Sequence, residues 1–361
     1  MKVLLKKSAH LVIATAAWLA VAFLWACALS VYFSPARSAL AGLLSLAFPC
    51  ALIAVVGMAL VTLVFSRRHL WVPLLGLALC WGRVRDYVPV NFSSEPPAGA
   101  VKVLTYNVHG FSDHTNTPRL TYFALEDILT SGADIVCLQE VYYLSSDTAT
   151  WAAVRERAST VYAHHDTVNI SSSMLTVFSH YPIVGHEPIC HDSTNGAAAF
   201  KLLLSPVDTL TVVNCHLASM RLSPDEREQY HTIVTNPENT DSTRHSLSRI
   251  EHRLVAGNRT RAAQAEAVAD YVRRHRGERL IVCGDFNDTP VSYAHHTIAS
   301  AGLTDAYAAT GRGPGRSFNR DAIFVRIDHI LMSSRLRPYA CRIDNTFRHS
   351  DHYPAVCYFT F

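Results

Sequence analysis

The sequence predicts a layered α/β domain that follows an apolar membrane region, and two observations support this fold class. Beyond residue 100, short β-rich runs alternate with helical patterns, which is typical of helices that cover sheets. The 361 residues are 49% hydrophobic and only 17% charged, and the apolar excess is concentrated in residues 1–90. This length allows a membrane segment followed by one large domain or two small ones.

Two uncharged stretches in the N-terminal region, residues 11–33 and 38–66, are long enough to cross a bilayer. The next apolar stretch is short for a span. Arg83 and Arg85 could extend their charged ends to the bilayer surface, however, so we expect a third span over about residues 70–88. A cleaved signal peptide is the alternative for the first stretch, but its length and the second stretch that follows at once favour a retained helix.

The distribution of basic residues predicts the orientation of these spans. Three lysines precede the first span and two arginines follow the second, whereas the loop between them holds only Arg37. This bias favours a cytoplasmic N-terminus. With three spans the remaining chain lies on the extracytoplasmic side, as we expect for this integral membrane protein, and with two spans it stays inside.

The charge balance of the remaining chain argues against nonspecific binding of nucleic acid. Residues 1–90 hold eight basic side chains and one acidic side chain, so the rest carries a net charge of −4 within the overall +3. Its only lysines are Lys102 and Lys201. Nonspecific nucleic-acid binding usually needs a basic surface, because affinity comes from neutralising phosphates. A bound metal or clustered arginines could still supply local positive charge.

The cysteines indicate core positions more than disulfides. Four of the nine lie inside apolar strand-like runs and are expected as small core residues. Cys190 and Cys341 could pair in an oxidising compartment, and the sequence leaves this open. These four core candidates are Cys137, Cys215, Cys283 and Cys357.

The expected α/β domain occupies residues 101–361 and follows a polar, proline-bearing linker at residues 91–100. Its strands are recognised as short β-rich runs between loops. They are expected at residues 101–108, 134–141, 174–184, 197–205, 209–217, 279–286, 326–333 and 353–361.

Helical patterns lie between some of these strands. Residues 119–130 precede the second strand, and residues 259–276 carry an alanine-rich face with arginines at the C-terminal end, where cations suit the helix dipole. Residues 219–258 form a long polar excursion in which we expect short helices. A capping-box pattern at residues 223–234 marks the start of one of them.

Polar side chains end most of the apolar runs. Taken alone, the stretch IVCGDFNDTP at residues 281–290 indicates a turn, because Gly, Asp, Asn and Pro are the usual turn residues. Buried carboxylates do not stabilise strands, since desolvating an unpaired charge is costly. A shared polar site at one edge of the scaffold explains the repetition better. Its candidate residues are Asn107, Glu140, His216, Asp285, Asn287, Asp328, Asp351 and His352.

Seven motifs appear in an order that resembles the endonuclease/exonuclease/phosphatase superfamily, which includes deoxyribonuclease I, abasic-site endonucleases, inositol polyphosphate 5-phosphatases and neutral sphingomyelinases. The motifs are TYNVHG (105–110), LQE (138–140), FSHYPI (178–183), NCHLAS (214–219), GDFND (284–288), RIDHIL (326–331) and SDHYP (350–354). The resemblance covers residues 100–361. It implies a four-layer α/β sandwich, in which two packed β-sheets are flanked by helices.

The same resemblance implies Mg²⁺- or Mn²⁺-dependent hydrolysis of phosphoesters by in-line attack of water. A hard cation prefers oxygen ligands and keeps several waters, so few protein ligands suffice. Glu140 is the implied metal ligand, with Asn107 and Asp351 close by or bridged through water. The cation would polarise the phosphoryl oxygen and stabilise charge on the leaving oxygen.

Five further residues receive catalytic roles from the resemblance. Asp285 would orient and deprotonate the attacking water, and Asn287 would hold the phosphate or the base. His352 would donate to a non-bridging phosphate oxygen, and Asp328 would fix its tautomer. His216 matches a second phosphate-binding histidine.

Two substrate-binding candidates lie outside the motifs. Asn195 is a candidate for a phosphate contact. Arg316 lies in the GRGPGRSFN stretch at residues 311–319, which could bind phosphate or be a plain loop. His109 is a departure, because abasic endonucleases carry an acidic residue at that place.

Structural alternatives remain open for several of these residues. Asn107 could be a turn residue, and Glu140 could be an exposed strand end. His216 could be a core histidine, and Asp328 could pair with Arg326.

Three functions are compatible with the sequence. The first is a membrane-tethered phosphohydrolase acting on a phospholipid, a sphingolipid or another phosphodiester at the bilayer. The second is a tethered nuclease outside the cytoplasm, and the third is a non-catalytic binding module on the same fold. The expected partners are the bilayer and a phosphoester substrate, and no protein partner is inferable.

Overall fold

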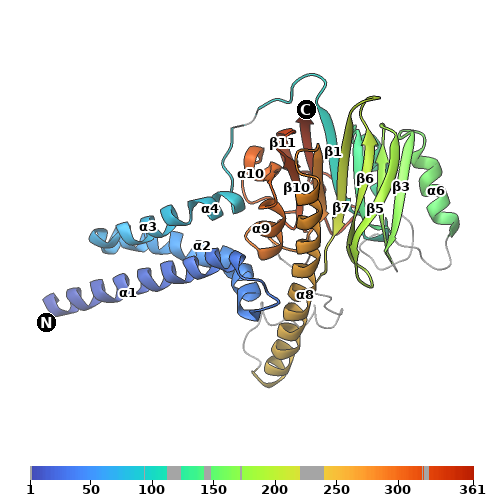
Figure 1. The fold of residues 1–361 in the computed structure, drawn as a ribbon. Coiled ribbons are helices and arrows are strands. Elements are labelled where there is room, and N and C mark those ends of the chain that lie inside the picture. Colours follow the sequence, from blue (N-terminus) through green and yellow to red (C-terminus); the bar gives the residue numbers. More distant parts are fainter. Residues whose placement is uncertain are drawn as a thin grey trace.

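The computed structural model describes residues 2–92, 94–111, 123–141, 148–170, 173–219, 240–318, 320 and 325–361. Two six-stranded sheets form its centre, and helices cover their outer faces (Figure 1). The expected four-layer α/β sandwich is therefore confirmed.

The first sheet has the strand order β11-β12-β1-β2-β4-β3. It comprises β1 (Val101–Asn107), β2 (Ile135–Val141), β3 (His164–Ile170), β4 (Ser173–Ser179), β11 (Arg337–Ile343) and β12 (Ala355–Thr360). Strands β1 and β2 are parallel, so their carboxyl ends lie at one edge of the sheet.

The second sheet has the order β5-β6-β7-β8-β10-β9. It comprises β5 (Ile183–His191), β6 (Gly196–Leu203), β7 (Thr209–His216), β8 (Leu280–Asp285), β9 (Leu303–Asp305) and β10 (Asp328–Ser333). Strands β7 and β8 are also parallel, so each sheet contains a central parallel pair.

Alternating side chains divide the strands between three apolar layers. Val103 of β1 points between the sheets and meets Phe200 of β6 and Val212 of β7, whereas Leu104 points outward. The period of two follows from the pleat of a β-strand. Outside, α5 (Phe123–Thr130) and α6 (Thr148–Ala158) cover the first sheet, and α8 (Thr240–Arg274) and α9 (Tyr293–Ala299) cover the second.

A buried polar link joins the two sheets near their carboxyl-end edges. Gln139 of β2 donates from Nε2 to Asn214 Oδ1 of β7 over 2.6 Å. The Asn214 amide in turn donates to the backbone oxygens of Leu138 and Thr176. Because buried amides are costly when unpaired, these bonds favour one register of β2 against β7.

The N-terminal region forms a helical bundle that projects from the domain (Figure 1). Its elements are α1 (Lys2–Leu29), η1 (Ser30–Tyr32), α2 (Ala39–Phe65), η2 (Arg67–His69), α3 (Trp71–Leu79) and α4 (Trp81–Tyr87). Two helices, Lys7–Tyr32 and Ala39–Phe65, are long and apolar enough to cross a membrane, and only 28% and 22% of their most apolar windows are buried. This suggests membrane association.

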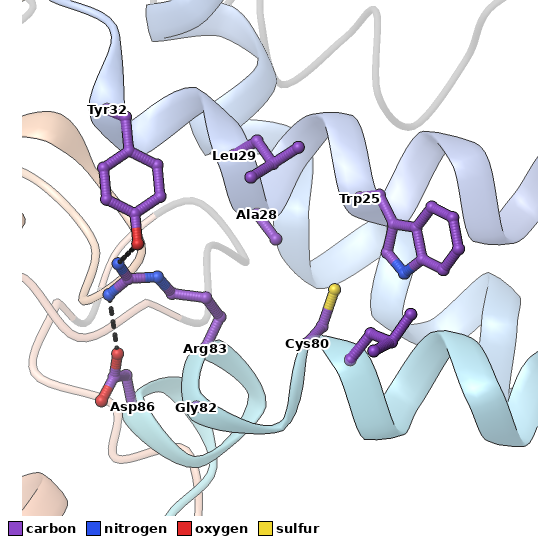
Figure 2. A pocket seen from close by; sticks show the side chains of 9 residues that line it. Trp25, Ala28, Leu29, Tyr32, Cys80, Gly82, Arg83 and Asp86 are labelled. Carbon is purple, nitrogen blue, oxygen red and sulfur yellow. Dashed lines mark hydrogen bonds and ion pairs between the residues drawn. The ribbon is translucent and has the colours of Figure 1, made fainter.

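The third bundle segment runs in the same direction as α1. Trp25 of α1 donates to Gly76 O of α3 over 3.3 Å, and one turn beyond the end of α1 the Tyr32 hydroxyl accepts from Arg83 of α4 over 3.1 Å (Figure 2). His10 Nδ1, in the first third of α1, lies 2.8 Å from Ser66 Oγ, just after the end of α2, and the two atoms are hydrogen-bonded. The chain therefore runs along the bundle three times, and the N-terminus and the α/β domain lie at opposite ends.

Direct hydrogen bonds join the bundle to the α/β domain. The buried Arg326 donates from Nη2 to Asp86 O of α4 over 2.6 Å. In the linker, Asn91 donates to Gly311 O over 2.8 Å. The linker thus begins with ordered contacts to the domain.

Some expected elements differ from the structure. The strand expected over residues 174–184 is wrong as one strand, because β4 and β5 lie in different sheets with a bend at residues 180–182. Strands β3, β9 and β11 were not predicted, because β3 has a polar sequence, β9 is short and β11 contains proline and two arginines. Residues 240–258 belong to the single helix α8, not to a set of short helices. The capping-box candidate at residues 223–234 lies outside the described residues.

All nine cysteines are free. The pairing left open for Cys190 and Cys341 is wrong, because Cys190 lies on β5 and Cys341 lies on β11 of the other sheet. The four cysteines expected in the core are buried, as predicted.

Candidate active site

The carboxyl ends of the two parallel strand pairs bring four polar side chains together. Asn107 ends β1, Glu140 lies near the end of β2, His216 ends β7 and Asp285 ends β8. Asn107 donates from Nδ2 to Glu140 Oε1 over 2.9 Å and to Asp285 Oδ2 over 3.1 Å. His216 Nε2 lies 3.4 Å from Glu140 Oε1 and 3.8 Å from Asp285 Oδ2. We call these four residues the strand-end cluster.

Unusual backbone conformations place these side chains. Glu140 has a φ of +54° at an irregularity in the β2–β4 pairing, and Asn287 has a φ of +53°. Gly284 has a φ of +136°, and a Cβ there would lie 1.9 Å from Cys215 O. Only glycine allows β8 to approach β7 this closely beside Asp285. Residues in such sparsely populated conformations concentrate at functional sites.

Asp285 is buried and held by two donors from Asn287. The backbone N–H of Asn287 donates to Asp285 Oδ1 over 2.8 Å, and its side-chain amide donates to Oδ2 over 3.1 Å. Burial raises the pKa of Asp285 to about 6, with the nearby Asp328 carboxylate adding to the rise and the His352 and His216 side chains opposing it. A carboxylate with a pKa near neutrality is suited to accept a proton.

His352 faces Asp285 from the segment just before β12. Its Nε2 lies 3.8 Å from Asp285 Oδ2, and its Nδ1 bonds to Asp328 Oδ2 over 2.9 Å. Burial disfavours the charged ring, but the Asp328 and Asp285 carboxylates outweigh this effect and raise the pKa of His352 to about 10. Arg326 donates instead to Pro314 O and to Asp86 O, so the described contacts give Asp328 the histidine partner and not the ion pair.

Glu140 is surrounded by donors. Burial opposes ionisation, but hydrogen bonds from His109, His216 and Asn107 outweigh it and hold the pKa of Glu140 well below its usual range. His109 Nδ1 lies 3.4 Å from Glu140 Oε2 and 3.8 Å from Asp351 Oδ1. The structural alternative of an exposed strand end does not fit this carboxylate, because it is ionised and its side chain is only 17% exposed.

Two residues of the site were missed as candidates from the sequence. His109, noted only as a departure from one branch, bridges Glu140 and Asp351. Arg320 Nε lies 3.6 Å from Asp351 Oδ2. The signal for His109 was its position two residues after Asn107, whereas Arg320 lies in a loop without a motif.

The two substrate-binding candidates differ in their contacts. Asn195 lies beside His216, with Asn195 Nδ2 3.0 Å from His216 Nε2 and 3.1 Å from Leu217 O. Arg316 donates from Nε to Phe318 O, and the Phe318 ring meets the His352 ring edge-on with 5.3 Å between centroids. Asn195 therefore contacts a site histidine directly, whereas Arg316 is linked to one only through Phe318. The roles of both residues stay predictions.

The strand-end cluster fits a divalent cation. Ligand atoms of Glu140, His216 and Asp285 lie within 4.8 Å of one another. The Asn107 amide places its N–H donors between the Glu140 and Asp285 carboxylates. A cation bound at this position would neutralise their negative charge. Buried carboxylates that converge in this way need such a charge partner.

The comparisons with known proteins agree with this fold. The sequence profile of the Endonuclease/Exonuclease/phosphatase family matches residues 104–352, and the chain belongs to this family. Its members are hydrolases that act on phosphoester bonds. A second profile, for a domain of unknown function, matches residues 10–87 of the bundle.

Individual relatives are distant. The uncharacterized protein YbhP of Escherichia coli K12 is 29% identical over 263 residues, which cover 70% of this chain and 93% of YbhP. An endonuclease/exonuclease/phosphatase from Beutenbergia cavernae has a TM-score of 0.51 at 16% identity and covers 73% of this chain and 72% of its own. The catalytic domain of human Nocturnin with bound sulfate has a TM-score of 0.50 at 18% identity over 73% and 93%. These structures show the fold alone.

Proposed function

We propose that this chain is a membrane-tethered phosphoester hydrolase that depends on Mg²⁺ or Mn²⁺ and acts on a substrate presented at the bilayer surface. The observation that carries the proposal is the position of Asp285, which lies 3.8 Å from both His216 and His352 inside the strand-end cluster. A carboxylate base, two histidines that could contact a phosphate group and a metal-binding carboxylate thus meet at one place.

Asp285 is the general base in this proposal. Asn287 holds both of its oxygens, so the carboxylate keeps one orientation while it takes a proton from the attacking water. Its pKa of about 6 leaves it mostly ionised at neutral pH and still able to accept that proton.

The two histidines bind the phosphoryl group. His352 is protonated at neutral pH, because its pKa of about 10 is set by burial and the stronger opposing effect of Asp328 and Asp285. With Nδ1 bonded to Asp328, His352 presents Nε2–H towards the cluster, where it donates to a non-bridging oxygen. His216 faces the same place from the opposite sheet, with Asn195 at its side, where it would contact the phosphoryl group.

Glu140 would hold the cation, with Asn107 and Asp351 close by. When bound, the cation supplies positive charge that stabilises the phosphoryl and leaving oxygens. His109 steadies Glu140 and Asp351 from the solvent side, since it lies within 3.8 Å of both carboxylates and its own ring is only partly buried.

The position of the bundle supports a substrate at the bilayer surface. Gly42 of α2 packs so closely on Asn258 of α8 that an added Cβ would lie 2.4 Å from Asn258 Nδ2. One turn further along α8, Arg261 donates to Asp288 over 2.9 Å and to Ala218 O over 2.8 Å. Asp288 lies three residues beyond the end of β8, and Ala218 lies two residues beyond the end of β7. The side chains of Asn258 and Arg261 therefore connect the bundle to the active-site loops.

We further propose that α3 and α4 together form the third membrane crossing. Residues 71–87 would extend about 25 Å as a helix, close to the hydrocarbon thickness. The bundle end that carries the N-terminus holds five basic side chains, and the domain end holds three. This bias supports an extracytoplasmic position for the α/β domain. Added protease should digest the domain in spheroplasts, and protection that is lost only after lysis would contradict this side.

The substrate class is tested with the full-length protein in detergent or in vesicles. Mixed phospholipid–sphingolipid vesicles and plasmid DNA are incubated in parallel with Mg²⁺. Asp285→Ala serves as the inactive variant and the exposed Asp270→Ala as the matched control. Asp285-dependent release of lipid headgroups with intact DNA supports the proposal. Asp285-dependent nicking of DNA with intact lipid would make the chain a tethered nuclease.

A further inference from the structure

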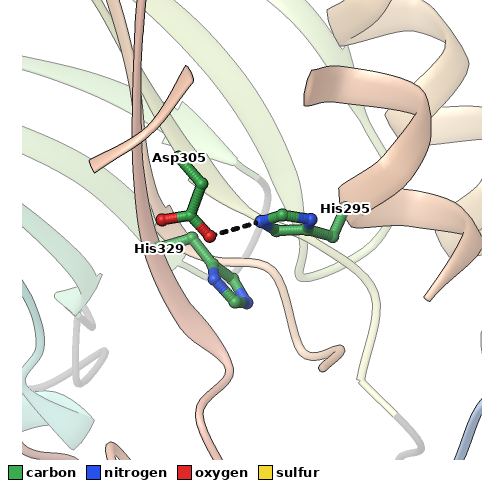
Figure 3. A group of neighbouring side chains, drawn as sticks. All are labelled: His295, Asp305 and His329. Carbon is green, nitrogen blue, oxygen red and sulfur yellow. Dashed lines mark hydrogen bonds and ion pairs between the residues drawn. The ribbon is translucent and has the colours of Figure 1, made fainter. Parts of the chain in front are cut away.

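A second group of metal-ligating side chains lies away from the strand-end cluster. His295 of α9, Asp305 at the end of β9 and His329 of β10 place one ligand atom each within 4.8 Å of one another (Figure 3). His295 Nε2 bonds to Asp305 Oδ2 over 3.0 Å, and the His295 and His329 rings lie 4.7 Å apart. All three side chains are at least 91% buried. We call these three residues the His–Asp–His group.

The hydrogen bonds of His329 leave one nitrogen as an unpartnered acceptor. Its Nε2 lies 2.9 Å from Asp288 O, and because a carbonyl oxygen only accepts, Nε2 carries the proton. Nδ1 is then a bare lone pair, and it is buried with no hydrogen-bond partner among the described residues.

This pattern is the one that metal-binding histidines adopt. A ligating imidazole almost always donates its second N–H to a carbonyl or carboxylate, which fixes the tautomer and points the other nitrogen at the ion. A purely structural role explains part of the group: Asp305 Oδ1 caps α10 (Ala306–Thr310) by accepting from the N–H groups of Tyr307 and Ala308, and Oδ2 pairs with His295. That role leaves Nδ1 of His329 unexplained, and a buried acceptor without a partner is costly.

We propose that His295, Asp305 and His329 form a binding site for a transition-metal ion such as Zn²⁺, separate from the strand-end cluster. Two imidazoles and one carboxylate are a common donor set for zinc, with a water or other ligand completing the coordination. Zinc ligands lie about 2.0–2.2 Å from the ion. The three ligand atoms would therefore move slightly closer to one another when the ion binds. To bind the ion, His295 Nε2 would give up the proton that it shares with Asp305, and this proton would move to His295 Nδ1 or leave to solvent.

The surroundings select the kind of ion. The buried Arg326 lies near Asp305 and stacks over the Tyr307 ring at 4.1 Å, so the site offers one carboxylate against one fixed positive charge. A hard ion such as Mg²⁺, which relies on anionic oxygens, is disfavoured there. A zinc ion gains its affinity from imidazole nitrogen and tolerates this balance.

The site lies beside a cleft and is connected to the active site. A cleft of about 490 Å³ between α4 and the α/β domain is lined by His295, Asp305 and Arg83, among other residues. On the other side, His329 follows Asp328 in the chain and bonds to the backbone of Asp288 in the loop after β8. An ion held here would therefore stiffen the loop that carries Asn287 and the strand that carries Asp328.

The test measures zinc in the full-length protein and needs no activity. A Glu140→Gln background weakens binding at the strand-end cluster, and after Zn²⁺ loading and gel filtration we expect about one tightly held Zn²⁺ per chain. His295→Asn in the same background should lose this ion. His296→Asn is the matched control, because His296 is the next residue of α9 and lies outside the group. Equal zinc content in the His295→Asn and His296→Asn variants, or none in the background protein, would overturn the proposal.

A second measurement covers the case in which His295→Asn fails to fold. Co²⁺ replaces Zn²⁺ in the Glu140→Gln protein, and its visible spectrum reports ligand type and geometry. We expect the intense bands of a four- or five-coordinate ion with nitrogen ligands. Weak bands like those of a hexa-aqua ion would overturn the proposal. This measurement requires no substitution in the His–Asp–His group.

Discussion

Replacing Gly284 with alanine should destabilise the protein more than any other single glycine-to-alanine change in the α/β domain. Gly284 has a φ of +136°, and an added Cβ would lie 1.9 Å from Cys215 O and 2.8 Å from its carbonyl carbon and amide nitrogen. All three atoms belong to the backbone of β7, so no side chain can rotate away. β7 and β8 must separate where His216 and Asp285 face each other.

The expected cost has two parts. A residue with a Cβ at this φ adds about 1–3 kcal/mol of backbone strain, and forcing an extra methyl group into a packed interior adds about 1–3 kcal/mol. The total of about 2–6 kcal/mol corresponds to a fall in Tm of about 5–20 °C for a domain of this size. Phosphoester hydrolysis should fall as well, because the shift displaces the two active-site strand ends.

The assay is thermal unfolding of the full-length protein in detergent, followed by intrinsic fluorescence. Gly277→Ala is the matched control, since Gly277 also has a positive φ of +93° but nothing lies within 4 Å of an added Cβ. This control measures conformational strain without the clash. A Tm for Gly284→Ala equal to that of Gly277→Ala would refute the argument that backbone contact at β7 requires glycine.

Three further predictions concern the site and its support. Arg261→Ala should lower the free energy of unfolding by about 3–5 kcal/mol in urea titrations, because it leaves the buried Asp288 carboxylate without its arginine partner. Arg279→Ala, which breaks the partly exposed pair with Asp208, should cost at most about 1 kcal/mol. Glu140→Gln should abolish the rise in Tm that Mg²⁺ or Mn²⁺ produces, and an unchanged rise would place the cation elsewhere. Asp328→Asn should lower kcat by about 10–100-fold and should also lower Tm, because His352 loses the carboxylate that orients its ring and pairs with its buried charge. A wild-type kcat for that variant would remove Asp328 from the positioning role.

The strand ends were the part of the site that the sequence could predict. Asn107, Glu140, His216 and Asp285 each follow an apolar run, and parallel strand pairs bring such ends to one edge. Periodicity alone could not predict which strands would be parallel, or that β4 and β5 would part into different sheets. That division depends on contacts between distant segments, such as the Gln139 link between sheets.

Residues without a strand or a motif escaped prediction for a physical reason. Arg320 reaches Asp351 from a loop, and His329 joins His295 across three elements. Nothing in the local sequence around a loop arginine or a lone core histidine distinguishes it from a structural residue. Only the fold shows that Nδ1 of His329 is buried without a partner among the described residues.

The most direct test of the central claim is hydrolysis of a simple phosphodiester, bis(p-nitrophenyl) phosphate, by the full-length protein with Mg²⁺ or Mn²⁺. The strand-end cluster predicts turnover that needs the cation and falls at least about 10²-fold in Asp285→Asn, the loss expected for removing a general base. Asp270→Asn should keep the wild-type rate, because that side chain is exposed on α8. An Asp285→Asn protein that unfolds at the wild-type temperature and hydrolyses the diester at the wild-type rate would contradict the assignment of this site.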